Sequence, residues 1–209
     1  KAPQPTGRVP FTWPAWRINN PQWRLFDYET YVGEGFEMNP ILFTAIMYKV
    51  RSITITPLRA YSGDPTDPKL LPKTNALQKL CRRPNAFQSW SEFMGLADAC
   101  LNLAGNAYIL FDRKGGETVG MYVMRPDRIV IVPKSDKKEI LGYMYLPEGQ
   151  SWPNGIPYMA RDVMHVKTPN LLDPLDGMGY GTPSTMPSAH ALDVDNDLTR
   201  FFHLFFKNG

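Results

Sequence analysis

The chain has 209 residues, of which 43% are hydrophobic and 21% are charged. This length and composition allow one or two domains with a sizeable core and exclude wholesale disorder. The net charge of +3 is too small to indicate nucleic-acid binding by itself, and no run of the sequence approaches the ~18 apolar residues of a membrane span.

Residues 1–38 are rich in proline and aromatic residues and show neither a helical nor a strand period. Such a segment cannot bury its rings alone, and leaving them in water is unfavourable. We expect an extended N-terminal arm that lies either on its own domain or on a neighbouring subunit.

The first regular element is a predicted helix. Asn39 is a good N-cap and Pro40 suits the first helical position. Apolar residues at helical spacing then continue the helix to about Arg51. Next, Ser52–Tyr61 is expected as a strand interrupted at Pro57.

Ser62–Lys73 is expected as a loop and Asn75–Arg82 as a short helix. Eight basic residues lie between Lys49 and Arg83, against two acids, Asp64 and Asp67. Such a patch can attract phosphates, form a solvated face, or meet an acidic neighbour. These three interpretations stay open.

Ser89 followed by Glu92 is a capping-box pattern, and the apolar stripe behind it predicts a helix that ends at Gly105. Cys100 falls on this stripe, and Cys81 lies near the end of the preceding helix. We expect both cysteines to be free thiols rather than a disulfide.

Several strands follow this helix, with a hairpin turn at Lys114–Glu117. We expect them to make one mostly antiparallel sheet. The predicted strands are Tyr108–Asp112, Thr118–Met124, Arg128–Pro133, Ile140–Leu146 and Val163–Val166.

Asp173–Thr182 is glycine-rich but lacks the Lys-Ser/Thr of a phosphate loop. A long helix is expected from about Pro183 to Lys207, with Pro183 and Pro187 at or before its first turn. Its apolar residues include Leu192 and Leu198 and four phenylalanines near its end, Phe201, Phe202, Phe205 and Phe206.

The case for catalysis is weak. Three histidines occur: His165 in a predicted strand, and His190 and His203 in the long helix. A strand histidine is more often a structural hydrogen-bonding group, and His190 with Asp193 gives only two ligands of a metal site. No Gly-x-Ser-x-Gly elbow is present. A metal-dependent nuclease is therefore the weaker alternative to a mechanical or assembly role.

Five segments around the Leu101–Asp112 motif (L-N-L-A-G-N-A-Y-I-L-F-D) resemble, in order and spacing, one family: the portal proteins, or head-to-tail connectors, of tailed bacteriophages. The resemblance covers about residues 39–209. The other matching segments are Arg82–Phe93, Met124–Ile129, Asp162–Lys167, Asp176–Ser184 and Phe205–Gly209.

The resemblance implies an α+β portal fold of the long-tailed phage type. It implies an arm at residues 1–38, a wing domain of helices and mostly antiparallel sheet at 39–176, a glycine-rich hinge at 177–182 and a stem helix at 183–209. Family members usually continue into a clip, a second stem helix and a crown, so the chain is expected to be a fragment.

The resemblance also implies function: a ring, commonly of twelve subunits, at one capsid vertex, through which double-stranded DNA is packaged and ejected without sequence specificity. Its partners would be the major capsid protein, the terminase large subunit and a head-tail adaptor. The protein would lie in the virion, and in the host cytoplasm during assembly. No enzyme activity, cofactor, metal or membrane is implied. A different ring-forming adaptor or capsid subunit stays open.

Two sets of residues on the long helix are candidates for this role. The four phenylalanines are candidates for contacts between subunits. Asp193, Asp197 and Arg200 are candidates for the channel face, because an acidic lining would repel phosphate and keep moving DNA from sticking.

Overall fold

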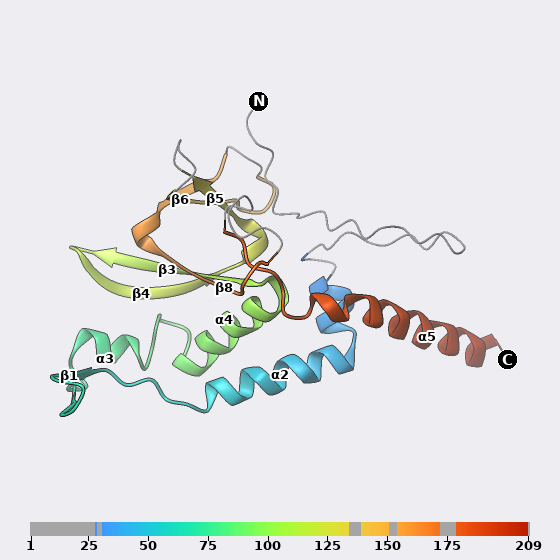
Figure 1. Cartoon of the computed structure of the whole chain (residues 1–209), viewed down its shortest axis with the longest axis horizontal. Coiled ribbons are helices and arrows are strands. Elements are labelled where there is room, and N and C mark those ends of the chain that lie inside the picture. The colour runs from blue at the N-terminus through green and yellow to red at the C-terminus, as the bar shows by residue number, and fades with distance from the viewer. Residues whose placement is uncertain (1–27, 29–30, 134–138, 151–153, 172–178, 209) are drawn as a thin grey trace.

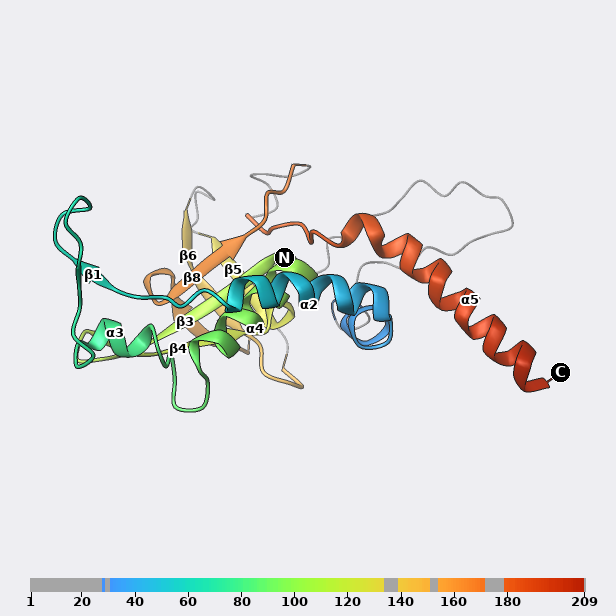
Figure 2. The ribbon, with the colours of Figure 1, turned by 90° about the horizontal axis from the view of Figure 1, so that it is seen from below.

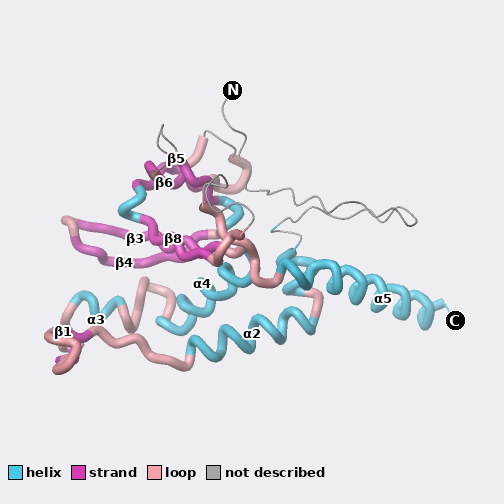
Figure 3. The backbone as a smooth tube through the Cα atoms, viewed as in Figure 1, coloured by secondary structure: helices cyan, strands magenta, loops and turns pink. Residues whose placement is uncertain are grey.

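The computed structural model describes residues 28, 31–133, 139–150, 154–171 and 179–208. Within them the chain forms a body of helices and two stacked sheets, from which one long helix, α5 (Ala189–Asn208), projects (Figure 1). The two longest helices of the body, α2 (Pro40–Thr54) and α4 (Trp90–Ala104), lie together on one side of the sheets (Figure 3).

The start of α2 confirms the predicted cap. The side chain of Asn39 accepts hydrogen bonds from the backbone N–H groups of Ile41 (3.0 Å) and Leu42 (3.1 Å), and Pro40 occupies the first turn. A short π-helical segment, η1 (Tyr31–Glu37), precedes it. Residues 1–27 and 29–30 of the predicted arm lie outside the described residues, whereas Tyr28, Val32 and Phe36 pack on the chain's own core.

The predicted strand at Ser52–Tyr61 is wrong. Its first three residues belong to α2. The buried stripe of Leu42, Ile46 and Val50 packs this helix against α4, and this packing outweighs the strand propensity of the β-branched residues near the end of the helix. Pairing begins only at β1 (Tyr61–Ser62), which joins β2 (Lys69–Leu70) inside the segment predicted as a loop. The short helix α3 (Ala76–Leu80) follows, capped by Asn75.

α4 has the predicted ends. Ser89 and Glu92 form the capping box, and Gly105 closes the helix with a left-handed backbone, φ 71°. Cys100 and Cys81 are both buried free thiols, as expected. Burial raises the pKa of the Cys100 thiol to about 11.

Two three-stranded antiparallel sheets form in place of the single predicted sheet. The first has the order β4-β3-β8 and the second β5-β6-β7, and β7 was not predicted. The bounds are β3 Asn106–Lys114, β4 Glu117–Met124, β5 Ile129–Pro133, β6 Ile140–Tyr145, β7 Ile156–Met159 and β8 Val163–Lys167.

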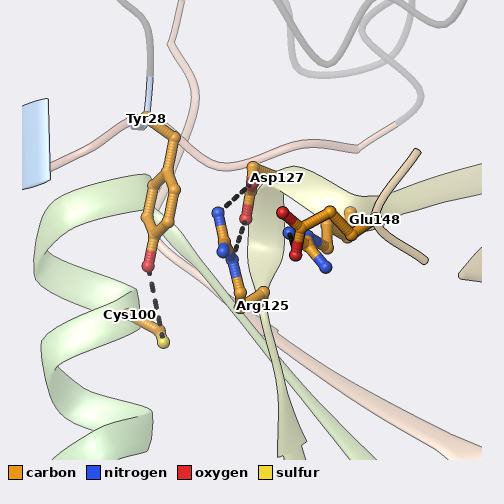
Figure 4. Close-up of polar contacts among 6 residues, drawn as sticks. Tyr28, Cys100, Arg125, Asp127 and Glu148 are labelled. Atoms are coloured by element: carbon orange, nitrogen blue, oxygen red, sulfur yellow. Dashed lines mark hydrogen bonds and ion pairs between the residues drawn. The ribbon is translucent and has the colours of Figure 1, made fainter. Parts of the chain in front are cut away.

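One short turn carries the chain from the first sheet to the second. It is the 3-10 helix η2 (Pro126–Arg128), whose missing proline N–H prevents further pairing of β4 at this point. Arg125 and Asp127 form an ion pair there, with N–O distances of 2.8 and 3.1 Å (Figure 4). A second short helix, η3 (Ala160–Asp162), leads from β7 back to β8 in the first sheet.

Apolar side chains fill the space between these layers. Tyr108 of β3 is fully buried and packs with residues of both sheets, including Ile131 and Tyr143. A second cluster, Ala97, Cys100 and Ala107, joins α4 to β3. The hydroxyl of Tyr28 lies 4.0 Å from the Cys100 sulfur on this helix (Figure 4), and burial raises the pKa of Tyr28 well above its usual range.

Candidate subunit interface

The long helix α5 begins later than the sequence indicates. The 3-10 helix η4 (Met186–Ser188) takes up the region after Pro183, because Pro187 lacks the N–H that a regular helix interior needs. From Ala189 the helix runs 20 residues, or about 30 Å. Figure 2 shows it leaving the body beyond the N-terminal end of α2.

The N-terminal part of α5 is fixed to the body by apolar packing and by one asparagine. Leu192 is buried in a cluster with Leu42, Ile46, Val50 and Leu103. Asn39, which caps α2 with its side-chain oxygen, donates through its amide nitrogen to Asp195 (2.8 Å) and Asn196 (3.1 Å). This single buried side chain therefore joins the start of α2 to α5.

The segment before α5 rests on the junction between α4 and β3. Asn106 accepts a hydrogen bond from the Gly181 N–H at 2.7 Å and donates to the Gly181 carbonyl at 3.2 Å. Thr168 donates its backbone N–H to the Gly105 carbonyl at 3.0 Å. Gly177 of the predicted hinge lies outside the described residues, whereas Gly179 and Gly181 lie in this contact region.

A third asparagine extends the attachment. The side-chain oxygen of Asn102 accepts hydrogen bonds from Ser184 (2.9 Å) and from Lys49, and its backbone carbonyl accepts from Thr185 (3.0 Å). Asn39, Asn102 and Asn106 are all buried. Sequence reasoning identified Asn39 only as a cap and gave Asn102 no role. No local signal marks Asn102, because it lies on the side of its helix away from the predicted apolar stripe.

Beyond its first turns, α5 presents an exposed apolar face. We define the α5 apolar face as Val194, Leu198, Phe201, Phe202, Phe205 and Phe206, all exposed. The four phenylalanines are 61%, 52%, 61% and 78% exposed in chain order. Their rings contact one another, with centroid distances of 5.5 to 6.3 Å.

The four aromatic side chains lie on one side of the helix and not all round it. At about 3.6 residues per turn, they occupy an arc of roughly 140°. Leu192, which the sequence pattern grouped with them, lies on a different side and enters the core. The exposed aromatic arc thus has no covering partner among the described residues.

The predicted channel residues share a second side of α5. Asp193, Asp197 and Arg200 are spaced by four and three residues, so they lie on one helical face, and all three are exposed. Asp195 points elsewhere, towards Asn39. Leu204, which is 47% exposed, lies on the same side as the predicted channel residues, so α5 has one largely apolar side and one largely charged side.

His165 has the structural role expected of a strand histidine. Its Nε2 lies 2.9 Å from the side-chain oxygen of Asn106, and its ring stacks on Tyr108 with a centroid distance of 4.4 Å. Burial, together with the nearby charge of Lys167, lowers the pKa of His165 to about 4. Among the described residues, no three His, Cys, Asp or Glu side chains gather as a metal site requires.

Within the described part of the chain, no helix is long and apolar enough to span a bilayer. The exposed apolar face of α5 lies beside charged residues of the same helix.

Comparison with known proteins agrees with this description. A family model described as "Phage portal protein" matches residues 40–209. No curated protein matches the chain.

Three solved structures share the fold at 23% sequence identity. A chain from the neck of an empty gene transfer agent (GTA) particle, computed with C6 symmetry, has a TM-score of 0.75, with 91% of this chain and 49% of that chain covered. A chain from the virion of a native GTA particle has a TM-score of 0.71, covering 92% and 48%. A chain from the neck of a native GTA particle, computed with C12 symmetry, has a TM-score of 0.70, covering 91% and 48%. The present chain spans about half the length of these solved chains.

Proposed function

Because this chain belongs to the phage portal protein family, we propose that it is the subunit of a ring at one vertex of a phage-like capsid. The observation that carries the proposal is the α5 apolar face, which is exposed on a helix fixed to the body only near its N-terminal end. Burying each phenylalanine against a neighbour is worth ~1.5–3 kcal/mol relative to full exposure. A ring supplies such a neighbour to every subunit.

The proposed regions follow the family resemblance. Residues 39–176 form the wing, 177–182 the hinge and 183–209 the first stem helix. In this arrangement Phe201, Phe202, Phe205 and Phe206 contact adjacent subunits. The charged side of α5, with Asp193, Asp197 and Arg200, faces the channel, where its carboxylates repel the phosphates of passing DNA.

The proposed role is mechanical. Double-stranded DNA passes through the ring in both directions without sequence readout, the terminase large subunit docks on it during packaging, and a head-tail adaptor binds it later. The major capsid protein surrounds it in the virion, after assembly in the host cytoplasm. The ring itself has no enzyme activity and needs no cofactor.

Native mass spectrometry and negative-stain microscopy of the protein test the proposal. We expect a closed ring, with twelve subunits as the proposed number, the rotational order used for the neck of the native GTA particle. A protein that stays monomeric at high concentration, with no ring at the imaged capsid vertex, would contradict it.

A further inference from the structure

A second exposed apolar surface lies on α2. We define the α2 outer stripe as Ile41, Ala45, Tyr48, Ser52 and Ile55, which recur at three- and four-residue spacing on the side of the helix opposite its buried residues. Ile41, Tyr48 and Ile55 are 64%, 75% and 78% exposed. Figure 2 shows α2 in front of α4, so this side of α2 faces away from the body.

We propose that the α5 apolar face of one subunit packs on the α2 outer stripe of the next. The inference rests on the proposed ring. A ring is built from heterologous contacts, in which two different patches of the same chain meet. The α2 outer stripe and the α5 apolar face are two such patches, on separate helices of one chain.

The two surfaces match in length and shape. The α5 apolar face extends about 18 Å along its helix, and the α2 outer stripe about 21 Å. Ala45 and Ser52 are small and lie between the larger Ile41, Tyr48 and Ile55. They leave grooves on α2 into which the ridge of phenylalanines fits.

The charges at the borders are complementary. Arg51 flanks the α2 outer stripe on one side and is exposed, and Lys49 lies on the other side, where its ammonium group also donates to Asn102. Asp197 borders the α5 apolar face on one side, and Asp195 lies on the other side near its N-terminal end. Opposite charges around an apolar contact fix its register and disfavour a contact between two α5 helices, where carboxylates would meet.

The area is also adequate. The four phenylalanines, each more than half exposed, offer about 500 Å². Specific interfaces bury at least about 1,000 Å² in total, or about 500 Å² on each side. The aromatic residues alone therefore approach the area that one such contact needs.

Disulfide cross-linking of the assembled protein tests the pairing. The native thiols of Cys81 and Cys100 are buried, so they add little background. We would pair cysteine at Ile41, Tyr48 or Ile55 with cysteine at Leu198, Phe201 or Phe205 in the same chain, oxidise the assembly, and run non-reducing gels. At least one pair should give a ladder of linked subunits.

The single variants are the matched controls, together with the pair Phe87→Cys and Phe201→Cys, because Phe87 is exposed on a different part of the body. None of these should give linked subunits, either as the dimer that one cysteine can form or as a ladder. A disulfide-linked dimer from Phe201→Cys alone would mean that α5 packs on α5 and would overturn the inference. So would an efficient link within one subunit between Tyr48→Cys and Trp16→Cys, because residues 1–27 would then cover α2.

Native mass spectrometry of the same samples separates the two proposals. A ring in which none of the nine pairs cross-links overturns the α2–α5 pairing and leaves the proposed function standing. An unmodified protein that forms no ring counts against the proposed function, and the pairing fails with it.

Discussion

Gly105 cannot carry a side chain for two separate reasons. Its backbone has φ 71°, a left-handed conformation that costs a residue with a Cβ about 1–2 kcal/mol. A Cβ there would also lie 2.4 Å from the carbonyl carbon of Thr182 and 2.7 Å from that of Gly181. The first reason could be predicted from the helix pattern, whereas the second depends on a segment some 75 residues further along the chain.

Replacement of Gly105 by alanine should therefore cost more than replacement of Gly115. Gly115 also has a positive φ, of 62°, but no atom lies within 4 Å of its Cβ position. We expect Gly115→Ala to lower the free energy of unfolding by about 1–2 kcal/mol. Gly105→Ala, and Gly105→Val more strongly, should exceed this by at least ~1–3 kcal/mol because the added atoms overpack the junction. Urea denaturation measures the free energy of unfolding of each variant. Equal losses for Gly105→Ala and Gly115→Ala would mean that the contacts around Gly105 do not exclude a side chain.

Asn39 has two roles that one substitution can separate. Aspartate caps helices about as well as asparagine, so Asn39→Asp should keep the start of α2. It replaces the amide that donates to Asp195 with a second carboxylate, so the attachment of α5 should be lost and replaced by repulsion. We expect protease cleavage in residues 179–188 to become faster while the circular dichroism of the body is kept.

Asn39→Ser is the matched control for this change, because serine also caps but adds no charge. It should weaken the attachment of α5 less than Asn39→Asp does. If both variants are cleaved at the wild-type rate, the hydrogen bonds of Asn39 do not hold α5. Sequence reasoning found the cap from local pattern alone, but the partner Asp195 lies 156 residues away, beyond the reach of any local pattern.

Among the elements, α5 carries the clearest test of function. Replacing Phe202 and Phe205 together by aspartate should block ring formation, because each ring buried against a neighbour is worth ~1.5–3 kcal/mol and the new carboxylates would be desolvated in the contact. The body should still fold, since both side chains are exposed. Native mass spectrometry measures ring formation, and circular dichroism measures whether the body still folds.

Leu171→Asp serves as the control for this double variant, because Leu171 is the most exposed large apolar residue described, at 90%. It should leave assembly unchanged. If the double phenylalanine variant assembles as the wild type does, the phenylalanines lie outside the subunit contact and the stem assignment is wrong.

Which elements could be predicted depended on how local their signals are. The capping box and Gly105 bound α4 within a few residues of sequence, and the two glycines after Lys114 fix the β3–β4 hairpin. By contrast, Ile53, Thr54 and Ile55 favour a strand by propensity but end a helix, because packing on α4 decides their state. The division into two sheets could not be predicted either, because it depends on which strands pair with each other and not on where each strand lies in the sequence.

For the whole molecule, His165 predicts how stability changes with pH. Its pKa is about 4 in the folded chain, against an ordinary value of 6.5, because it is buried beside Lys167, Tyr108 and Tyr143. Between these two pH values the unfolded chain binds a proton that the folded chain does not bind. The contribution of His165 to the free energy of unfolding should therefore fall as the pH is lowered from 6.5 to 4, and stay constant above 6.5.

The stability difference between the wild type and His165→Gln isolates this effect. His165→Gln should lose less stability than the wild type when the pH is lowered from 7 to 4.5. His203→Gln controls for the loss of an imidazole, because His203 is exposed on α5. If the difference between wild type and His165→Gln is the same at both pH values, protonation of His165 does not account for the acid sensitivity.

The attachment of α5 at one end gives the helix the geometry of a lever. Asn196, the last residue of α5 that Asn39 contacts, lies about 18 Å along the axis from Asn208. A rotation of about 10° at this point would move the far end of the helix by about 3 Å, roughly the width of an aromatic ring. Because Asn39 also caps α2, such a rotation would pull on the start of α2 as well. A displacement at the tip of α5 would thus be transmitted along α2 through the Asn39 amide and through Leu192, which packs on the same helix.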